Sequence, residues 1–435
     1  SSEGRKGVTL PPREIDVQLA ELIPAKYHRK DTARLPEVSE LDVMRHYIEL
    51  SHKNHFIEKG LYPLGSCTMK YNPKVHESLV RHTCFANLHP YQPESTLQGA
   101  LELMYELQQD LAEISGMAKV TLQPVAGAQG EFTGIKIISA YHKAKGNTHK
   151  TKIIIPDSAH GTNPATCNLV GFDVVELKSD ENGRCDIARL KEIVDENTAG
   201  FMLTNPNTLG LFETQIEQIA EIMHNVDALI YMDGANLNAL LGIVQPGKIG
   251  FDVMHFNLHK TFATPHGGGG PGAGPVGVSE KLIPYLPVPM VSRDENGYHL
   301  DYSHEATSIG KVQSFYGNFA VLVRAYIYIK MLGAKGLRKV SENAIINANY
   351  LMAILKDYYH IQHPEPCMHE FVADGSWQKK ESGVSTLDIA KRLLDKGFHA
   401  PTVYFPLIIP EAMMVEPTET ESLDSLDAFA NAMIE

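Results

Sequence analysis

Cysteine, long apolar runs and positive net charge are all scarce in this 435-residue chain. The five cysteines are scattered and form no C-x-x-C pair, which argues against a disulfide framework and fits reduced thiols inside a cell. No apolar run approaches the length of a membrane span, and no apolar stretch follows the N-terminus as it would in a signal peptide. The net charge of −13 at pH 7 argues against nucleic acid or an anionic membrane as the main partner. We therefore expect a soluble, cytoplasmic protein.

The composition is typical of a globular protein with a sizeable core. Hydrophobic residues make up 43% of the chain and charged residues 21%, which is ordinary for such proteins. The length alone suggests two or three domains. The chain begins with Ser1 and not with Met, so we expect its start to be processed or cut.

Apolar runs of strand length alternate with amphipathic stretches of helix length over the middle of the chain. The expected strands are 152–156, 173–177, 199–203, 227–232 and 251–256, and the expected helices are 98–115, 187–195 and 215–224. Polar residues recur where successive strands end, which is how a doubly wound, mostly parallel sheet builds one site at its carboxyl edge. We therefore predict an α/β fold with a smaller α+β domain at the C-terminal end.

One lysine stands at the centre of this pattern. Lys260 follows the run 251–256, Asp233 follows the run 227–232, and glycines occupy positions 267–270, 272 and 274. Two neighbouring parallel strands would place Lys260 and Asp233 at the same edge of the sheet. A lysine that forms a Schiff base and an acid that keeps a pyridinium nitrogen protonated are what a pyridoxal phosphate enzyme needs. The alternative is a surface lysine beside a flexible loop.

A phosphate site is predicted where small residues open a helix. Ala128, Gln129 and Gly130 stand at the start of a long apolar helix, where free N–H groups and the helix dipole favour an anion. The alternative is a tight turn with an ordinary N-cap.

Three further residues are candidates for holding a cofactor. His160 follows a strand and could stack on an aromatic ring, although an isolated histidine is more often a structural hydrogen-bonder. Asn205 also follows a strand and could donate a hydrogen bond to a phenolic oxygen. We place His259, the neighbour of Lys260, in the same group.

The first 95 residues are polar and proline-rich, and we expect them to form an arm that packs against another surface. Two loop-like stretches in it carry Ser66 and Cys67, and Tyr91 and Glu94. Such loops often reach into sites. The alternative is a solvated connector, and no local signature supports Cys67 as a nucleophile.

We expect three parts: an arm (1–95), a large cofactor-binding domain (96–318) and a small α+β domain (319–435). In the small domain, His369 and Glu370 are adjacent, so on a strand their side chains would point to opposite faces and could not both bind one metal. We therefore expect no metal site.

Seven motifs occur in one order along the chain. They are GSCTMKYNP (65–73), HPYQPE (89–94), AGAQGE (126–131), SAHGTNP (158–164), MDGAN (232–236), NLHKTF (257–262) and EPTETE (416–421). Together they closely resemble the P-protein of the glycine cleavage system, the pyridoxal phosphate-dependent glycine decarboxylase, over essentially the whole chain. More narrowly, the set is similar to the second, catalytic subunit of the two-subunit form. The C-terminus looks short for that family, which leaves the last helix open.

The resemblance implies a fold-type I enzyme, similar to the aspartate aminotransferases. It implies that Lys260 is the Schiff-base lysine, that Asp233 is the pyridinium partner and that His160 stacks on the ring. The phosphate would be cradled by Ala128, Gln129 and Gly130.

The implied reaction is the decarboxylation of glycine, with release of CO2 and transfer of the aminomethyl group to the lipoyl arm of the H-protein. Ser66, Cys67, Tyr91 and Glu94 would line a channel for that arm. The implied partners are the lipoylated H-protein and the other P-protein subunit, with two such pairs in a heterotetramer.

Two alternatives remain at this point. Another fold-type I enzyme, such as an amino-acid decarboxylase or a cysteine desulfurase, can share the lysine and the aspartate at the strand end. A non-catalytic P-protein scaffold subunit would resemble this chain but lack the lysine, which argues against it because Lys260 is present.

Overall fold

The computed structural model describes residues 4–5, 7, 12, 14, 16–31, 33–266 and 272–435. These residues form two compact units, Ser1–Lys59 and Gly60–Glu435. The glycine run 267–270 lies outside the described residues. Within the described part of the chain, no helix is long and apolar enough to cross a membrane.

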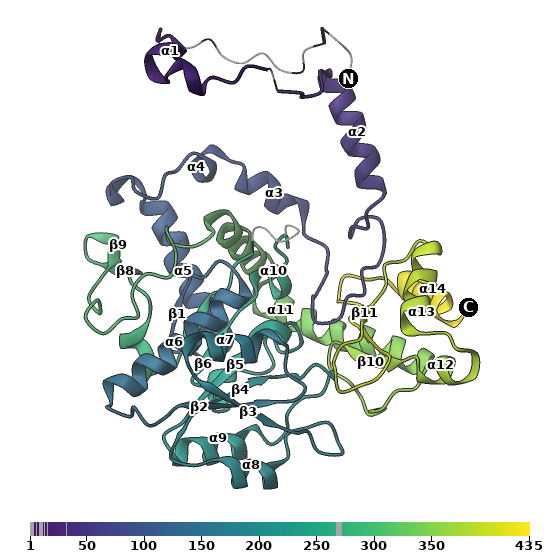
Figure 1. Cartoon of the computed structure of the whole chain (residues 1–435). Coiled ribbons are helices and arrows are strands. Elements are labelled where there is room, and N and C mark those ends of the chain that lie inside the picture. Colours follow the sequence, from purple (N-terminus) through teal and green to yellow (C-terminus); the bar gives the residue numbers. More distant parts are fainter. Residues whose placement is uncertain are drawn as a thin grey trace. The chain divides into compact units, whose positions relative to one another are not determined.

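The first unit has short helices and no buried apolar residue among its described positions. Its elements are α1 (Leu19–Leu22), η1 (Ala25–Tyr27) and α2 (Glu40–His52) (Figure 1). α2 begins with a capping box, in which Ser39 Oγ accepts a hydrogen bond from the backbone N–H of Asp42 (3.2 Å). Leu41, Met44 and Tyr47 lie on α2 and are exposed. A unit with so little core of its own needs another surface on which to bury its apolar side chains.

A seven-stranded sheet forms the centre of the second unit, in the order β1-β7-β6-β5-β4-β2-β3 (Figure 1). Its strands are β1 (Lys119–Thr121), β2 (Lys152–Pro156), β3 (Asp173–Leu177), β4 (Thr198–Thr204), β5 (Leu229–Asp233), β6 (Val253–His255) and β7 (Val276–Val278). The pairs β3–β2, β2–β4, β4–β5 and β5–β6 are parallel, whereas β7 runs antiparallel to both β6 and β1. The predicted mostly parallel sheet is confirmed.

Both faces of this sheet are buried. Successive residues of β4 belong to different apolar clusters: Phe201 and Leu203 pack in one cluster, and Met202 packs in the other. β5 shows the same alternation, with Ile230 in the first cluster and Tyr231 in the second. Because side chains alternate across a strand, an unbroken apolar run is what a strand covered on both faces requires.

Helices alternate with these strands along the chain and cover the sheet. They are α3 (Lys74–Val80), α4 (Thr83–Ala86), η2 (Glu94–Thr96), α5 (Gln98–Ser115), α6 (Gly127–Ala144), α7 (Thr162–Val170), α8 (Ile187–Ile193), α9 (Ile216–Asn225), η3 (Gly234–Ala239), η4 (Pro246–Lys248), α10 (Leu258–Thr261) and η5 (Glu280–Tyr285). α5 coincides with the helix predicted at 98–115, because Leu107 and Leu111 repeat at helical spacing and are fully buried. Gly116 ends it in the left-handed conformation, at φ 70°.

The C-terminal part is α+β. Its elements are α11 (Phe319–Leu355), α12 (Ser376–Ser382), α13 (Thr386–Asp395), α14 (Leu423–Ile434), and β10 (Phe371–Asp374), β11 (Thr402–Val403) and β12 (Ala412–Val415) in one antiparallel sheet. Gly333 interrupts the helical backbone of α11 at φ 59°. The last helix, α14, is present. The division at residues 95 and 318 stays a prediction.

One hairpin was missed. β8 (Met290–Asp294) and β9 (Gly297–Asp301) pair as an antiparallel hairpin that was not predicted from the sequence. The signal was present in the sequence, because Asn296-Gly297 is a dipeptide that favours a tight hairpin turn.

The segment that follows residue 60 packs along the C-terminal sheet. The N–H of Gly65 donates to Met414 O (3.2 Å), and the N–H of Glu416 donates to Pro63 O (3.1 Å). Farther along this segment, Lys70 Nζ forms an ion pair with Glu419 Oε1 (2.8 Å). The side chain of Lys70 is only 1% exposed and that of Glu419 only 7%, so this pair fixes the segment to the C-terminal part in a water-poor place.

Lys70→Met should therefore cost about 3–5 kcal/mol of stability, because it leaves the carboxylate of Glu419 buried without its cation. The matched control is Lys330→Met, which removes an ion pair with Asp110 whose lysine side chain is 44% exposed. That control should cost about 0–1 kcal/mol. Thermal unfolding of the purified variants measures both effects. Equal losses of stability in the two variants would contradict the conclusion that the Lys70–Glu419 pair fixes the segment in a water-poor place.

Candidate functional site

A cavity of about 340 Å³ opens at the carboxyl ends of β4, β5 and β6. Seven of its lining residues were predicted for the site: Ser66, Cys67, Ala128, His160, Asp233, His259 and Lys260. They come from the segment after residue 60, from helix starts and from strand ends. The fold therefore brings together residues that lie nearly 200 positions apart.

Asp233 ends β5 and is fully enclosed. Its Oδ1 accepts a hydrogen bond from the N–H of Ala235 (2.9 Å), and its Oδ2 accepts one from Asn163 Nδ2 (3.1 Å). Burial alone would raise the pKa of Asp233, but nearby His255, the Asn163 hydrogen bond and the charge of Lys260 outweigh it and hold the pKa below its ordinary value. The group is therefore a carboxylate at neutral pH.

His255, on β6, contacts the carboxylate of Asp233. Its Nε2 lies 3.4 Å from Asp233 Oδ1 and 2.8 Å from Asn257 Nδ2. Its Nδ1 lies 2.6 Å from the hydroxyl of Tyr231. Burial lowers the pKa of His255, and these contacts hold its imidazole in one orientation against the carboxylate.

Lys260 lies on the short helix α10, lines the cavity and is half-buried. Its Nζ has no hydrogen bond or ion pair with any residue that the structure describes. Its neighbour His259 accepts a hydrogen bond from the N–H of Ala273 through Nδ1 (3.4 Å). Burial lowers the pKa of His259 to about 3, and neighbouring His266 adds to this effect. His259 is therefore neutral beside the lysine.

The start of α6 has the features of an anion site. No side chain caps this 18-residue helix, so the first N–H groups are free to bind a ligand. Gly127 and Ala128 line the cavity. A Cβ on Gly127 would lie 2.5 Å from Asn257 Oδ1, which shows how closely the backbone approaches the strand end.

Gln129 and Gly130, the other predicted phosphate residues, do not line the cavity. The side chain of Gln129 is used within the fold, because its Oε1 accepts from the N–H of Val125 (2.8 Å) and its Nε2 donates to Val312 O (2.7 Å). Gly130 packs so closely that a Cβ would lie 2.8 Å from Gly274 O. Their part in phosphate binding stays a prediction that rests on backbone N–H groups.

Asn205 lies at the end of β4, in the layer beneath the cavity. Its Oδ1 accepts from the N–H of Glu213 (3.0 Å), while its buried Nδ2 has no partner among the described residues. Thr204 Oγ1 is buried and unpartnered in the same way. Thr204 lines the cavity, so a polar ligand there would satisfy its hydroxyl, whereas Asn205 does not line it.

His160 stands at the cavity wall and is exposed there. Its Nδ1 lies 2.8 Å from Thr162 Oγ1, and its ring meets Phe405 edge-on at 5.6 Å between centroids. Thr162 Oγ1 also donates to Glu131 Oε1 (2.8 Å), so the imidazole is positioned by a short polar chain.

The two arm loops lie at different cavities. Ser66 and Cys67 line the polar one, whereas Glu94 lines a separate apolar cavity of about 330 Å³ that includes Leu97, Phe315 and Phe319. The hydroxyl of Tyr91 donates to Ser314 O (2.8 Å), beside this second cavity. A single channel lined by all four predicted residues stays a prediction.

Several lining residues were missed. Glu131 lines the cavity and directly follows the predicted phosphate residues 128–130. That position in the sequence was a signal that it belongs to the site. Burial, and then the charge of Asp233, raises the pKa of Glu131 to about 7. Thr402 and Phe405 come from the C-terminal part, and no local pattern marks them.

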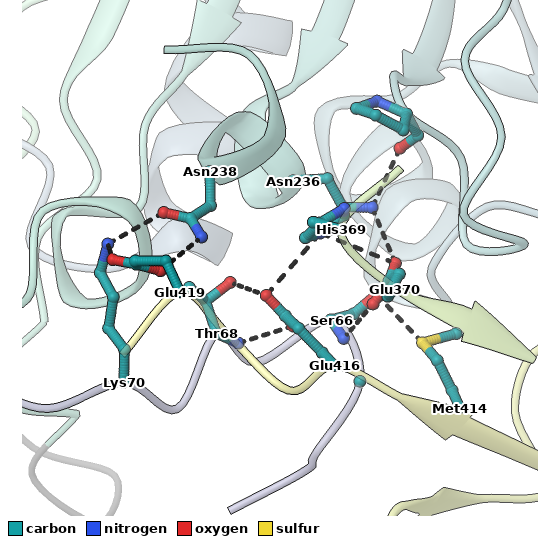
Figure 2. Close-up of polar contacts among 12 residues, drawn as sticks. Ser66, Thr68, Lys70, Asn236, Asn238, His369, Glu370, Met414, Glu416 and Glu419 are labelled. Carbon is teal, nitrogen blue, oxygen red and sulfur yellow. Dashed lines mark hydrogen bonds and ion pairs between the residues drawn. The ribbon is translucent and has the colours of Figure 1, made fainter. Parts of the chain in front are cut away.

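The argument that His369 and Glu370 cannot share one ion is wrong. β10 begins at Phe371, so strand alternation does not apply to these two residues. His369, Glu370 and Glu416 are buried, and each offers one ligand atom within 4.8 Å of the others (Figure 2).

The main cavity fits a phosphorylated, positively charged aromatic cofactor. An uncapped helix start would hold its phosphate, a buried carboxylate would face its ring nitrogen, and an unpaired lysine would carry it. This combination has the donor set that pyridoxal phosphate needs.

Comparisons with known proteins agree with this geometry. Residues 129–366 match the family described as "Aminotransferase class-V", and residues 340–435 match "Glycine dehydrogenase, C-terminal domain". Among solved structures, the glycine decarboxylase (P-protein) of the glycine cleavage system in inhibitor-bound form superposes with a TM-score of 0.79 at 22% identity, over 96% of this chain and 94% of that one. A glutamate decarboxylase from Lactobacillus brevis has a TM-score of 0.70 at 15% identity, over 94% and 96%. These matches confirm the predicted fold class.

Relatives of much higher identity cover the whole chain. A probable glycine dehydrogenase (decarboxylating) subunit 2 of Halalkalibacterium halodurans is 58% identical, over 100% of this chain and 89% of the relative. The protein of the same description from Chlorobium chlorochromatii is 59% identical, over 100% and 90%. This chain therefore belongs to the family of glycine dehydrogenase (decarboxylating) subunit 2.

Proposed function

We propose that this chain is the catalytic subunit of a glycine decarboxylase of the glycine cleavage system. With pyridoxal 5′-phosphate bound, it releases the carboxylate of glycine as CO2 and passes the aminomethyl group to a lipoyl arm on the H-protein. The observation that carries the proposal is one cavity in which Lys260 and Asp233 face the same space, in a chain of this family.

Each residue has a distinct part in this reaction. Pyridoxal phosphate, when bound, supplies a ring that withdraws electrons from the Cα of the amino acid. Lys260 would attach the cofactor through Nζ. Asp233, kept ionised by its neighbours, holds a proton on the ring nitrogen and so keeps the ring electron-poor. The first turn of α6 binds the phosphate, and His160 covers one ring face.

The alternatives are weaker. Cysteine desulfurases and glutamate decarboxylases superpose at 14–15% identity, which reflects the shared fold, whereas the subunit 2 relatives are 57–59% identical over the whole chain. A scaffold role does not explain why Lys260 and a buried Asp233, whose charge is balanced by its neighbours, line the same cavity.

A partner subunit is part of this proposal. The first unit exposes apolar residues along α2 and buries none of that helix. A second P-protein subunit would cover such residues, and two pairs would form a heterotetramer. An obligate interface of this kind buries about 2,000 Å² or more.

Lys260→Ala should abolish turnover, because the cofactor loses its attachment point. Borohydride reduction of the native protein with pyridoxal phosphate, followed by peptide mapping, should place the label on Lys260. Lys281→Ala is the control, since that lysine is an exposed partner of Asp252 outside the cavity. Label on any other lysine would refute the assignment.

Asp233→Asn should retain cofactor but slow decarboxylation by about 10²- to 10⁴-fold, since an amide cannot hold the ring nitrogen protonated; this corresponds to an electrostatic loss of about 3–5 kcal/mol. Exchange of labelled CO2 into the glycine carboxyl measures the step. Asp395→Asn, which changes a carboxylate whose side chain is 70% exposed, should behave as the native protein. Near-native exchange in Asp233→Asn would count against its role.

The isolated chain should be poorly active or prone to aggregate, because the apolar residues of its first unit lack a cover. Adding the other P-protein subunit should restore decarboxylation with the H-protein, and light scattering should detect a complex of two pairs. A stable, fully active monomer that ignores the partner would overturn this expectation.

A further inference from the structure

Two buried glutamates meet at one end of the small C-terminal sheet. Glu370 directly precedes β10, and Glu416 directly follows β12. Phe371 and Val415 are partners in the antiparallel pairing of these strands, so the register sets the two glutamates opposite each other. Both residues are fully buried, and a carboxylate oxygen of each lies within 4.8 Å of the other.

All four carboxylate oxygens of this pair accept hydrogen bonds (Figure 2). Glu416 accepts from the N–H of Thr68 at Oε2 (2.8 Å) and from the hydroxyl of Thr68 at Oε1 (2.6 Å). Glu370 Oε2 accepts from the N–H of Ser66 (2.6 Å), and Glu370 Oε1 accepts from Asn236 Nδ2 (3.1 Å). An ionised carboxyl group only accepts hydrogen bonds, so this arrangement favours two carboxylates with a joint charge of −2.

The chain does not balance this charge with a cation of its own. In the described part of the chain, no lysine or arginine forms an ion pair with Glu370 or Glu416, and their only ionic neighbour is a histidine. Glu411, which is also buried beside β12, has Lys379 as its partner. Because buried charges are costly unless they are paired or coordinate a metal, the two carboxylates call for a positive charge from outside the chain.

The histidine beside them indicates which kind of cation fits. His369 is fully buried, and neither of its ring nitrogens has a hydrogen-bond partner among the described residues. Its Nε2 lies 4.0 Å from Glu370 Oε1 and 3.8 Å from Glu416 Oε1, which is too far for hydrogen bonds. Two atoms that bind one Zn²⁺ at about 2.1 Å each lie at most about 4.2 Å apart. Both spacings therefore fit one ion held between the three side chains.

We propose that His369, Glu370 and Glu416 bind one divalent transition-metal ion of the Zn²⁺ class. The two carboxylates neutralise its charge, and the imidazole nitrogen completes a set of three protein ligands, with a water as the fourth. Mg²⁺ and Ca²⁺ prefer oxygen ligands alone, so the imidazole selects against them. The hydrogen bonds from Asn236 and Thr68 orient the two carboxylates, as the partners of metal ligands commonly do.

The ion holds a loop at the wall of the polar cavity. None of its three ligands lines that cavity among the described residues, so the ion lies outside the reacting space. Ser66 and Thr68 have positive φ, 56° and 49°, and both donate to the ligating carboxylates. Ser66 also lines the cavity. The ion therefore stabilises a strained part of the cavity wall, and this role does not depend on which reaction the cavity performs.

The first test measures metal binding by the native chain in complex with its partner subunit and with pyridoxal phosphate. The complex is stripped of metal with a chelator and then titrated with Zn²⁺. Mass spectrometry of the metal content should find one tightly bound Zn²⁺ per chain, and the melting temperature should fall on stripping and recover with Zn²⁺. A native complex that binds no Zn²⁺ would overturn the proposal and leave the two glutamates to share a proton.

Three variants test the ligands one by one. His369→Gln, Glu370→Gln and Glu416→Gln should each weaken Zn²⁺ binding by about 100-fold or more, because each removes one of three protein ligands. Glu411→Gln is the matched control, since it changes a buried glutamate next to the same sheet that has its own lysine. It should bind Zn²⁺ as the native chain does. Equal Zn²⁺ affinity in all four variants would place the ion elsewhere and overturn the assignment.

A second readout needs no variant, so it decides the matter even if a substituted chain does not fold. X-ray absorption at the zinc edge of the native complex should show only nitrogen and oxygen ligands at about 2.0–2.2 Å, with the scattering pattern of one imidazole. Sulfur ligands at about 2.3 Å would assign the ion to cysteines such as Cys67 and refute the proposed site.

Discussion

The carboxylate of Asp233 is ionised although it is almost completely enclosed. The need to stabilise this buried charge shapes much of the site. A buried charge is tolerated only with hydrogen-bond donors and nearby positive charge. The N–H of Ala235, the amide of Asn163 and Lys260 supply these from three different elements. His255, on the neighbouring strand, places its Nε2 3.4 Å from Asp233 Oδ1. The ends of these strands are therefore held together by side-chain contacts around Asp233 as well as by backbone hydrogen bonds.

The C-terminal part contributes more than a cover for the sheet. The loop at Ser66 and Thr68 has two residues at positive φ, 56° and 49°, a conformation that side chains other than glycine rarely adopt. The carboxyl groups of Glu370 and Glu416 accept hydrogen bonds from this loop and hold it at the cavity wall. The shape of the cavity thus depends on contacts between residues more than 300 positions apart.

Local patterns predicted much of the fold. The strands 152–156 and 173–177 and the helix 98–115 match the structure residue for residue, because their apolar spacing reflects faces that really are buried. Lys260 and Asp233 were recognisable because each comes after an apolar run of strand length, 251–256 and 227–232 respectively. The hairpin of β8 and β9 was missed because its short strands are polar and only half-buried, so that the turn dipeptide was the main signal.

The sequence by itself determined the order of strands and helices, the family and the residues at the carboxyl edge of the sheet, since these depend on periodicity and on neighbours in the chain. Only the tertiary structure decided that Glu370 and Glu416 meet beside His369, that Tyr91 and Glu94 lie away from the Lys260 cavity, and that Thr402 and Phe405 line it. These residues have no local signal, because their environment is made by segments that are distant in the chain. Burial and the approach of like charges, which shift the pKa values of such groups, exist only once those segments have packed.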